Sequence, residues 1–210
     1  MHKDDPKDKV KHAIADLRQG RLVVVRDHES REDEGDLVCA AERCTPQNVN
    51  FMVTHGRGLL CVPMTSERAR SLKLPPMATQ NTEAHRCKFT VSVDYAHGTA
   101  SGISADDRSK TIQALADPMT KSGDLRRPGH VFPLVAAEGG LAERDGHTEA
   151  SVELMRLAGL QPVAAICEIL KDDGSMMRGD DLSAFCERWG LVLLSIDDIL
   201  RVLSCKHEGA

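Results

Sequence analysis

Residues 21–42, "RLVVVRDHESREDEGDLVCAAE", contain two apolar runs that enclose a dense group of charges. Residues 21–25 and 36–42 are mostly apolar, which predicts two buried strands. Six acidic residues fall between Asp27 and Asp36, both included. A charge cluster is most often a solvated loop, but carboxylates can also gather to hold a ligand.

Three features of this acidic stretch favour a ligand site. Its two strands could be joined by a shorter connection. Gly35 permits backbone conformations that help a loop fold inward, and Arg31 can orient carboxylates or bind an anion. Carboxylate oxygens suit Mg²⁺ or Mn²⁺, and such ions keep coordination positions open for water and substrate.

The rest of the chain alternates between extended and helical patterns. Further strand patterns cover residues 58–64, 89–94, 130–137, 163–170 and 191–195. Helical patterns with start or stop signals cover residues 6–19, 47–55, 107–117, 148–159, 182–190 and 196–203. Pro133 interrupts its strand and predicts an edge or a bend, while residues 73–88 have no periodicity and predict a mobile loop.

These elements predict a single domain of the α+β class over residues 1–210. The length suits one sizeable core, and the sequence has no repeat, low-complexity segment or linker. Because helices do not follow every strand, the pattern favours α+β over a doubly wound sheet.

Composition argues against several kinds of partner. The net charge of -5 gives no general attraction to nucleic acid or lipid, and one Trp, one Tyr and four Phe are too few for a base-stacking platform. Seven cysteines without a C-x-x-C pair fit neither a disulfide framework nor a zinc ribbon. No apolar run resembles a secretory signal or a membrane span. We therefore expect a cytoplasmic protein with no nucleic-acid or membrane partner.

A second group of chemically capable residues lies at 126–149. His130 and His147 each follow a glycine, and His147 stands where a predicted helix begins. Free N–H groups and the positive dipole end make such a position suitable for phosphate. Arg144 adds a guanidinium and Thr148 a hydroxyl, although the local pattern leaves open that Thr148 is only the N-cap of this helix.

Glu168 interrupts the apolar strand pattern of residues 163–170. A buried carboxylate is costly unless it is paired or protonated, so Glu168 either faces water at a strand end or is buried. A buried Glu168 would hold its proton more readily, which suits a general acid or base.

The chain resembles the 3,4-dihydroxy-2-butanone 4-phosphate synthase family of riboflavin biosynthesis, in its monofunctional form. The fused GTP cyclohydrolase II domain of some relatives is expected to be absent. The order and spacing of the motifs carry the resemblance, which runs almost end to end. The motifs are "DHESREDEGDLV" (27–38), "THGRGLLCV" (54–62), "FTVSVD" (89–94), "SGISADDRSKTI" (101–112), "DLRRPGHVFPL" (124–134), "GGLAERDGHTEA" (139–150) and "ICEI" (166–169).

The resemblance implies an α+β homodimer with active sites at the subunit interface and two Mg²⁺ or Mn²⁺ ions in each site. It implies the conversion of D-ribulose 5-phosphate to L-3,4-dihydroxy-2-butanone 4-phosphate and formate, a lyase reaction. Removing a proton beside a carbonyl leaves an enediolate, which a Lewis acid stabilises. The dehydration and skeletal rearrangement that follow need acid–base groups.

The resemblance also implies roles for individual residues. Glu32 and His147 would be the metal ligands, and His130 and Glu168 would be essential to catalysis. Asp27 and Glu34 would be supporting residues, whereas Cys61 is given no role. The residues expected to bind substrate are Arg31, Glu32, Asp36, Arg144, Asp145, Gly146, His147, Thr148 and Glu168.

Two departures from the family pattern and three alternatives remain open. Asp33 stands where Asn is frequent and Ser30 where Asp is frequent, so either could alter metal preference. Glu29 and Asp33 are expected to be solvent-facing charges.

The loop at 73–88 and the acidic loop could close as lids. A sugar-phosphate isomerase or aldolase would release no formate, and a non-enzymatic metal-binding module would catalyse nothing.

Overall fold

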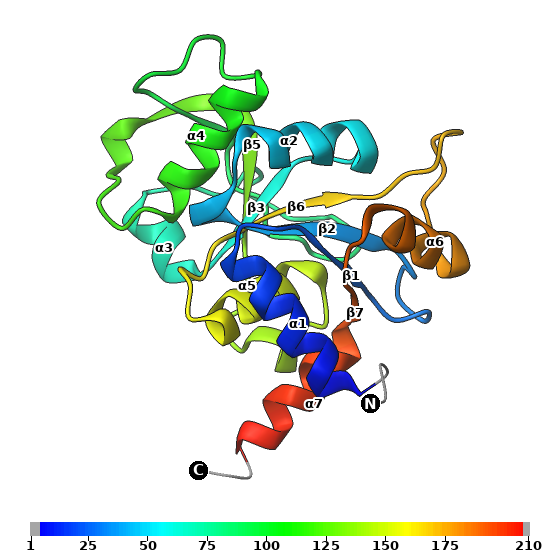
Figure 1. The fold of residues 1–210 in the computed structure, drawn as a ribbon. Coiled ribbons are helices and arrows are strands. Elements are labelled where there is room, and N and C mark those ends of the chain that lie inside the picture. Colours follow the sequence, from blue (N-terminus) through cyan, green and yellow to red (C-terminus); the bar gives the residue numbers. More distant parts are fainter. Residues whose placement is uncertain (1–4, 208–210) are drawn as a thin grey trace.

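A seven-stranded mixed sheet forms the centre of the structure, a computed structural model that describes residues 5–207 (Figure 1). Residues 1–4, part of the charged N-terminus, and 208–210 lie outside the described residues. The strands follow the order β4-β5-β3-β6-β2-β1-β7. Their bounds are β1 Val23–Arg26, β2 Gly35–Ala40, β3 Cys61–Met64, β4 Val93–Tyr95, β5 Leu125–Val135, β6 Ala164–Glu168 and β7 Leu193–Ser195.

Helices cover both faces of the sheet (Figure 1). One face packs against α2 (Pro46–Phe51), α3 (Ser66–Ser71), α4 (Ala105–Ala116) and α6 (Gly179–Trp189). The other packs against α1 (Pro6–Arg18), α5 (His147–Ala158) and α7 (Ile196–His207). Short helical turns complete the chain at η1 (Ala41–Arg43), η2 (Met52–Gly56), η3 (Ser122–Asp124) and η4 (Gly140–Ala142). The predicted α+β class is confirmed.

The apolar runs around the acidic loop form central strands that are buried on both faces. Val24 and Leu37 enter one core, and Val25 and Val38 enter the other. Successive side chains of a strand point to opposite faces, so a strand covered on both sides needs a continuous apolar run rather than alternation.

Helix ends follow the signals that the sequence carries. Thr45 accepts the N–H of Asn48 at the start of α2, and Ser104 accepts that of Asp107 at the start of α4. At the other end of α5, Gly159 adopts a left-handed conformation (φ +66°), as a C-terminal glycine should.

The prediction that Pro133 marks an edge is wrong, because β5 lies between β4 and β3. Pro133 pairs with Val62 of β3, while its carbonyl accepts the N–H of Thr90. The N–H and C=O of one residue point the same way, so the missing donor faces the irregular segment before β4 and leaves the β3 ladder intact. Residues 73–88 contain no helix or strand, as expected; their mobility stays a prediction.

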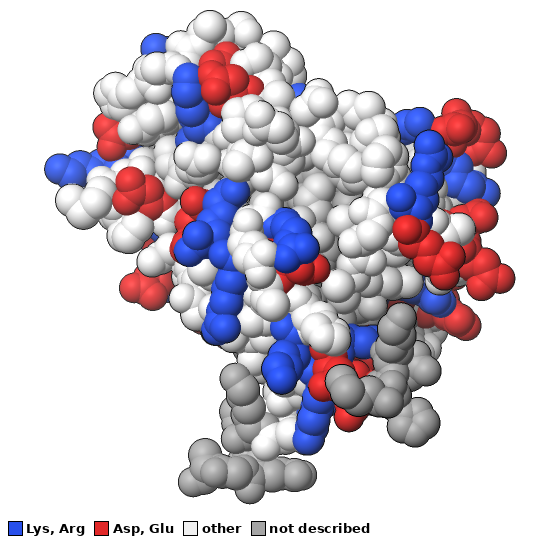
Figure 2. Space-filling model, in the orientation of Figure 1, with Lys and Arg blue, Asp and Glu red and all other residues white. Residues whose placement is uncertain are grey.

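The surface carries mixed charge. Figure 2 shows Lys and Arg interspersed with Asp and Glu on one face of the molecule. Among residues 5–207, no helix is both long and apolar enough to cross a membrane.

Candidate active site

The acidic stretch is the turn of a hairpin in which Arg26 of β1 pairs with Gly35 of β2. Asp27 is buried and holds the turn inward, because its Oδ1 accepts the N–H of Glu34 at 2.8 Å. Its Oδ2 lies 2.6 Å from the guanidinium of Arg31. The alternative of a wholly solvated loop is therefore wrong for the carboxylate of Asp27.

The turn depends on different residues from those expected. The left-handed backbone occurs at Asp33 (φ +54°), a conformation that Asn and Asp tolerate better than most residues do. Gly35 instead permits close packing, since a Cβ there would lie 2.6 Å from the side chain of Leu182. Glu29 is exposed as predicted, but Asp33 is half-buried and lies 2.8 Å from Arg26.

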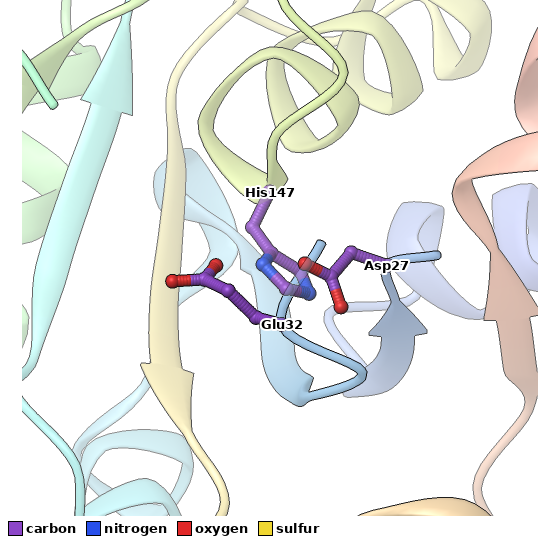
Figure 3. A group of neighbouring side chains, drawn as sticks. All are labelled: Asp27, Glu32 and His147. Carbon is purple, nitrogen blue, oxygen red and sulfur yellow. The ribbon is translucent and has the colours of Figure 1, made fainter. Parts of the chain in front are cut away.

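Asp27, Glu32 and His147 form a cluster suited to a cation. Each offers one ligand atom, and these atoms all lie within 4.8 Å of one another. Figure 3 shows His147 descending from the start of α5 to lie beside the two side chains of the acidic loop. Glu32 and His147 are thus brought together across 115 positions of sequence (147 − 32), and Asp27 joins them.

The ring of His147 is prepared for a ligand. Its Nε2 is buried and has no hydrogen-bond partner among the described residues. Burial lowers the pKa of His147, with the Asp27 carboxylate opposing this and the Arg31 guanidinium adding to it, so the ring is neutral at neutral pH. A neutral imidazole beside two carboxylates offers a nitrogen that can bind a divalent cation. The residues present therefore fit a bound divalent metal.

Two basic side chains also touch Glu32. Arg31 bridges Glu32 and Asp27 through one guanidinium nitrogen. His85 lies with its Nε2 3.3 Å from Glu32 Oε1. The sequence interpretation missed His85, because its loop has no pattern that would place it against the acidic stretch.

The start of α5 has free donors. The N-cap position is Gly146, which offers no side chain, so the alternative that Thr148 is only the N-cap is wrong. Arg144 packs against Gly146, where a Cβ would lie 2.2 Å from its Nη1. The same guanidinium nitrogen lies 2.6 Å from Glu149, a buried carboxylate that the sequence interpretation missed although it lies in the "GHTEA" motif.

Asp36 and Glu168 form an acidic pair in neighbouring strands, since Asp36 of β2 is the direct register partner of Glu168 of β6. Asp36 is the buried member, while Glu168 is half-buried and its Oε2 accepts the N–H of Leu59 at 2.8 Å. Burial, followed by the charge of Glu168, raises the pKa of Asp36 well above its usual range. Burial and the same two charges raise the pKa of the Cys61 thiol, so it remains protonated.

His130 is exposed and paired with Asp94 of β4, at 2.8 Å between ring Nδ1 and Oδ2. The strand register relates it to Glu168. Phe132 pairs with Cys61 of β3, which in turn pairs with Ile166 of β6. Because β3 is parallel to β5 and antiparallel to β6, His130 and Glu168 lie toward the same end of the sheet.

The structure therefore brings most of the predicted site to one sheet end, near the start of α5. Asp145 is exposed in the segment before that helix. Asp94, His85 and Glu149 are the additions. Asp94 could have been suspected from sequence as an acid that ends the alternating pattern "FTVSVD".

This fold and site define a mixed α/β protein whose carboxylate–histidine cluster suits a divalent cation. The family model described as 3,4-dihydroxy-2-butanone 4-phosphate synthase matches residues 11–202. The chain is 51% identical over 193 residues to a 3,4-dihydroxy-2-butanone 4-phosphate synthase of Oceanobacillus iheyensis, covering 92% of this chain and 93% of that protein. The chain belongs to the 3,4-dihydroxy-2-butanone 4-phosphate synthase family.

The chain is also similar to a longer protein and to a crystal structure that contains magnesium ions. The riboflavin biosynthesis protein RibBA of Bacillus mycoides is 48% identical over 192 residues, but the chain spans only 48% of its length. A crystal structure of a 3,4-dihydroxy-2-butanone 4-phosphate synthase in complex with two magnesium ions superposes with a TM-score of 0.90 at 44% identity, covering 94% of this chain and 97% of that one.

Proposed function

We propose that this chain converts D-ribulose 5-phosphate to L-3,4-dihydroxy-2-butanone 4-phosphate and formate in riboflavin biosynthesis. The observation that carries the proposal is the cluster of Asp27, Glu32 and His147, whose ligand atoms all lie within 4.8 Å of one another. Membership of the synthase family supports the reaction and its substrate.

Mg²⁺ or Mn²⁺ is the proposed cofactor, with two ions in each site. Glu32 and His147 would hold the metal, and Asp27 lies close enough to contribute a third ligand atom. The relative with two magnesium ions supports magnesium and a count of two, whereas manganese rests on the family resemblance alone. When bound, such ions supply Lewis-acid polarisation of substrate oxygens.

The substrate would lie between the acidic loop and the start of α5. Its phosphate suits the uncapped N–H groups and positive dipole of that helix, with Arg144 and Thr148 beside them. Asp145 and Gly146 complete this proposed phosphate-binding segment. Arg31 and Asp36 would contact the sugar portion.

Proton transfers would use groups at the same sheet end. Asp36 holds a proton readily, and its register partner Glu168 has Oε2 engaged by Leu59, which leaves Oε1 available to take or deliver a proton. His130 offers Nε2, because its Nδ1 faces Asp94. We propose Glu168 and His130 as the catalytic acid–base groups.

A formate assay tests this function. The purified chain with D-ribulose 5-phosphate and Mg²⁺ should release formate, a chelator should stop the release, and added metal should restore it. Glu32→Gln should lose turnover while keeping the far-UV circular dichroism of the parent. Glu29→Gln, in the same turn but exposed and outside the cluster, is the matched control. A folded, metal-supplied protein that consumes the sugar phosphate without formate would contradict the proposal and favour an isomerase or aldolase.

A further inference from the structure

His130 and Asp94 make a two-point contact between β5 and β4. Asp94 Oδ2 lies 2.8 Å from ring Nδ1 of His130, and Asp94 Oδ1 accepts the backbone N–H of His130 at 2.8 Å. The side chain of Asp94 is 10% exposed, whereas that of His130 is 43% exposed. The carboxylate of Asp94 is therefore largely buried, whereas the ring of His130 is partly accessible to solvent.

This contact has a chemical consequence for the imidazole. An ionised carboxylate only accepts hydrogen bonds, so it selects the tautomer of His130 that carries its proton on Nδ1. The lone pair of the neutral ring is then on Nε2. Because both carboxylate oxygens are engaged by one residue, Asp94 also determines the direction in which the ring points.

A tight turn closes over the pair. Gly102 has φ +89°, and a Cβ there would lie 2.1 Å from Asp94 Oδ2 and 2.7 Å from His130 Nδ1. The carboxylate of Asp107 holds the turn in place, since it accepts the N–H groups of Ala100 at 3.1 Å and Gly102 at 2.9 Å. The backbone thus excludes other side chains from the contact.

We propose that Asp94 is a positioning residue that orients the ring of His130 so that its Nε2 is presented to the sugar phosphate. This inference rests on the proposed function, in which His130 moves protons. Asp94 acts through the ring and does not itself touch the substrate, and Gly102 is the position that leaves room for the contact.

The test compares two His–Asp pairs of the same chain. Asp94→Asn should lower kcat for formate release by about 100-fold or more and change KM less than about twofold, because general acid–base catalysis contributes about 10²–10⁴ to a rate. The exposed pair of His97 and Asp124, 3.0 Å apart, supplies the control, and Asp124→Asn should leave kcat within about twofold.

A spectroscopic readout separates positioning from a general structural effect. Nitrogen-15 NMR of the imidazole should report His130 with its proton on Nδ1 in the parent and with more of it on Nε2 in Asp94→Asn. A folded Asp94→Asn protein with kcat within threefold of the parent, or with an unchanged tautomer, would overturn the proposal.

A second pair of variants covers the case in which Asp94→Asn does not fold. Gly102→Ala should lower kcat and shift the His130 signals, whereas Gly98→Ala is matched in backbone (φ +67°) but meets no atom within 4 Å and should do neither.

The parent and His130→Ala distinguish the two proposals. A parent that releases no formate refutes the proposed function. An active His130→Ala refutes the proposed role of His130 in proton transfer. An inactive His130→Ala beside an active Asp94→Asn refutes only the positioning role.

Discussion

At the scale of single residues, Glu32 and Asp33 are neighbours in sequence with different partners in space. Glu32 faces Asp27 and His147, whereas Asp33 turns away through a left-handed backbone to Arg26. The extra charge at Asp33 is thus balanced within the loop. The departure from the family pattern therefore disturbs the proposed metal ligands little.

This difference predicts unequal effects on metal affinity. Glu32→Gln should weaken Mn²⁺ binding, measured by calorimetry, by at least about tenfold, because it removes the negative charge that a hard cation prefers. Asp33→Asn should leave the affinity within about threefold, since Asn tolerates the same backbone. Equal losses in both variants would contradict the assignment of Glu32 as a ligand.

Asp36 predicts a pH-dependent stability. Its pKa is raised in the folded state, so the folded protein binds this proton more tightly than the unfolded chain does. That contribution is fully present below the ordinary pKa of an Asp, about 3.9, and is lost as pH rises through the folded-state pKa. Asp36→Asn removes the charge that is costly at neutral pH.

In buffer with chelator at pH 7.5, Asp36→Asn should therefore unfold at a higher temperature than the parent while losing turnover. The difference between the two melting temperatures should shrink at pH 4.5. A variant that melts lower than the parent at both pH values would contradict the buried, proton-holding state of Asp36.

At the scale of elements, the pairing of β4 with β5 depends on close backbone contact. A Cβ at Gly129 would lie 2.0 Å from the carbonyl carbon of Val93 and 2.3 Å from the nitrogen of Asp94. Backbone atoms cannot move aside as a flexible side chain can. Gly129→Ala should therefore separate the strands that carry His130 and Asp94.

We expect Gly129→Ala to destabilise the fold by about 3 kcal/mol or more, measured by urea unfolding, because overpacking against backbone is among the costlier substitutions. Gly123→Ala, at a site that meets no atom within 4 Å, should change stability by less than about 1 kcal/mol. Similar unfolding midpoints for the two variants would show that the strands tolerate separation.

At the scale of the whole molecule, exposed apolar side chains flank the site. Leu59 donates its N–H to Glu168, and Ile103 follows the glycine that packs on His130. The homodimer that the family resemblance implies, with its active site at the interface, would cover such apolar groups.

Ile103→Glu should therefore convert the protein from dimer to monomer in light scattering at micromolar concentration and lower formate release about tenfold or more, because a charge is costly to bury at an interface. Met119→Glu is the control, because Met119 is also an exposed large apolar residue (77% exposed, compared with 52% for Ile103). A parent that is monomeric while active would refute the dimer but not the reaction.

Local sequence patterns predicted most of the elements, and the family resemblance implied the chemistry. The helix α3 (Ser66–Ser71) had no predicted counterpart, and the strand expected at residues 89–94 forms only over Val93–Tyr95. Continuous apolar runs predicted the central strands, and residues 148–159 predicted a helix that begins in the structure at His147. The acidic stretch predicted a cation site. These features are local, because periodicity and capping depend on residues a few positions apart.

Which distant groups meet follows from strand order and packing in the folded chain. The pairing of β2 with β6 places Asp36 beside Glu168. The pairing of β4 with β5 brings together the strands that carry Asp94 and His130, whose side chains are in contact. The need for a glycine at position 35 comes from its close packing against Leu182, which is distant in sequence. Strand order and register join segments far apart in sequence, and no short-range pattern records which strands become neighbours, so these contacts follow from the folded chain alone.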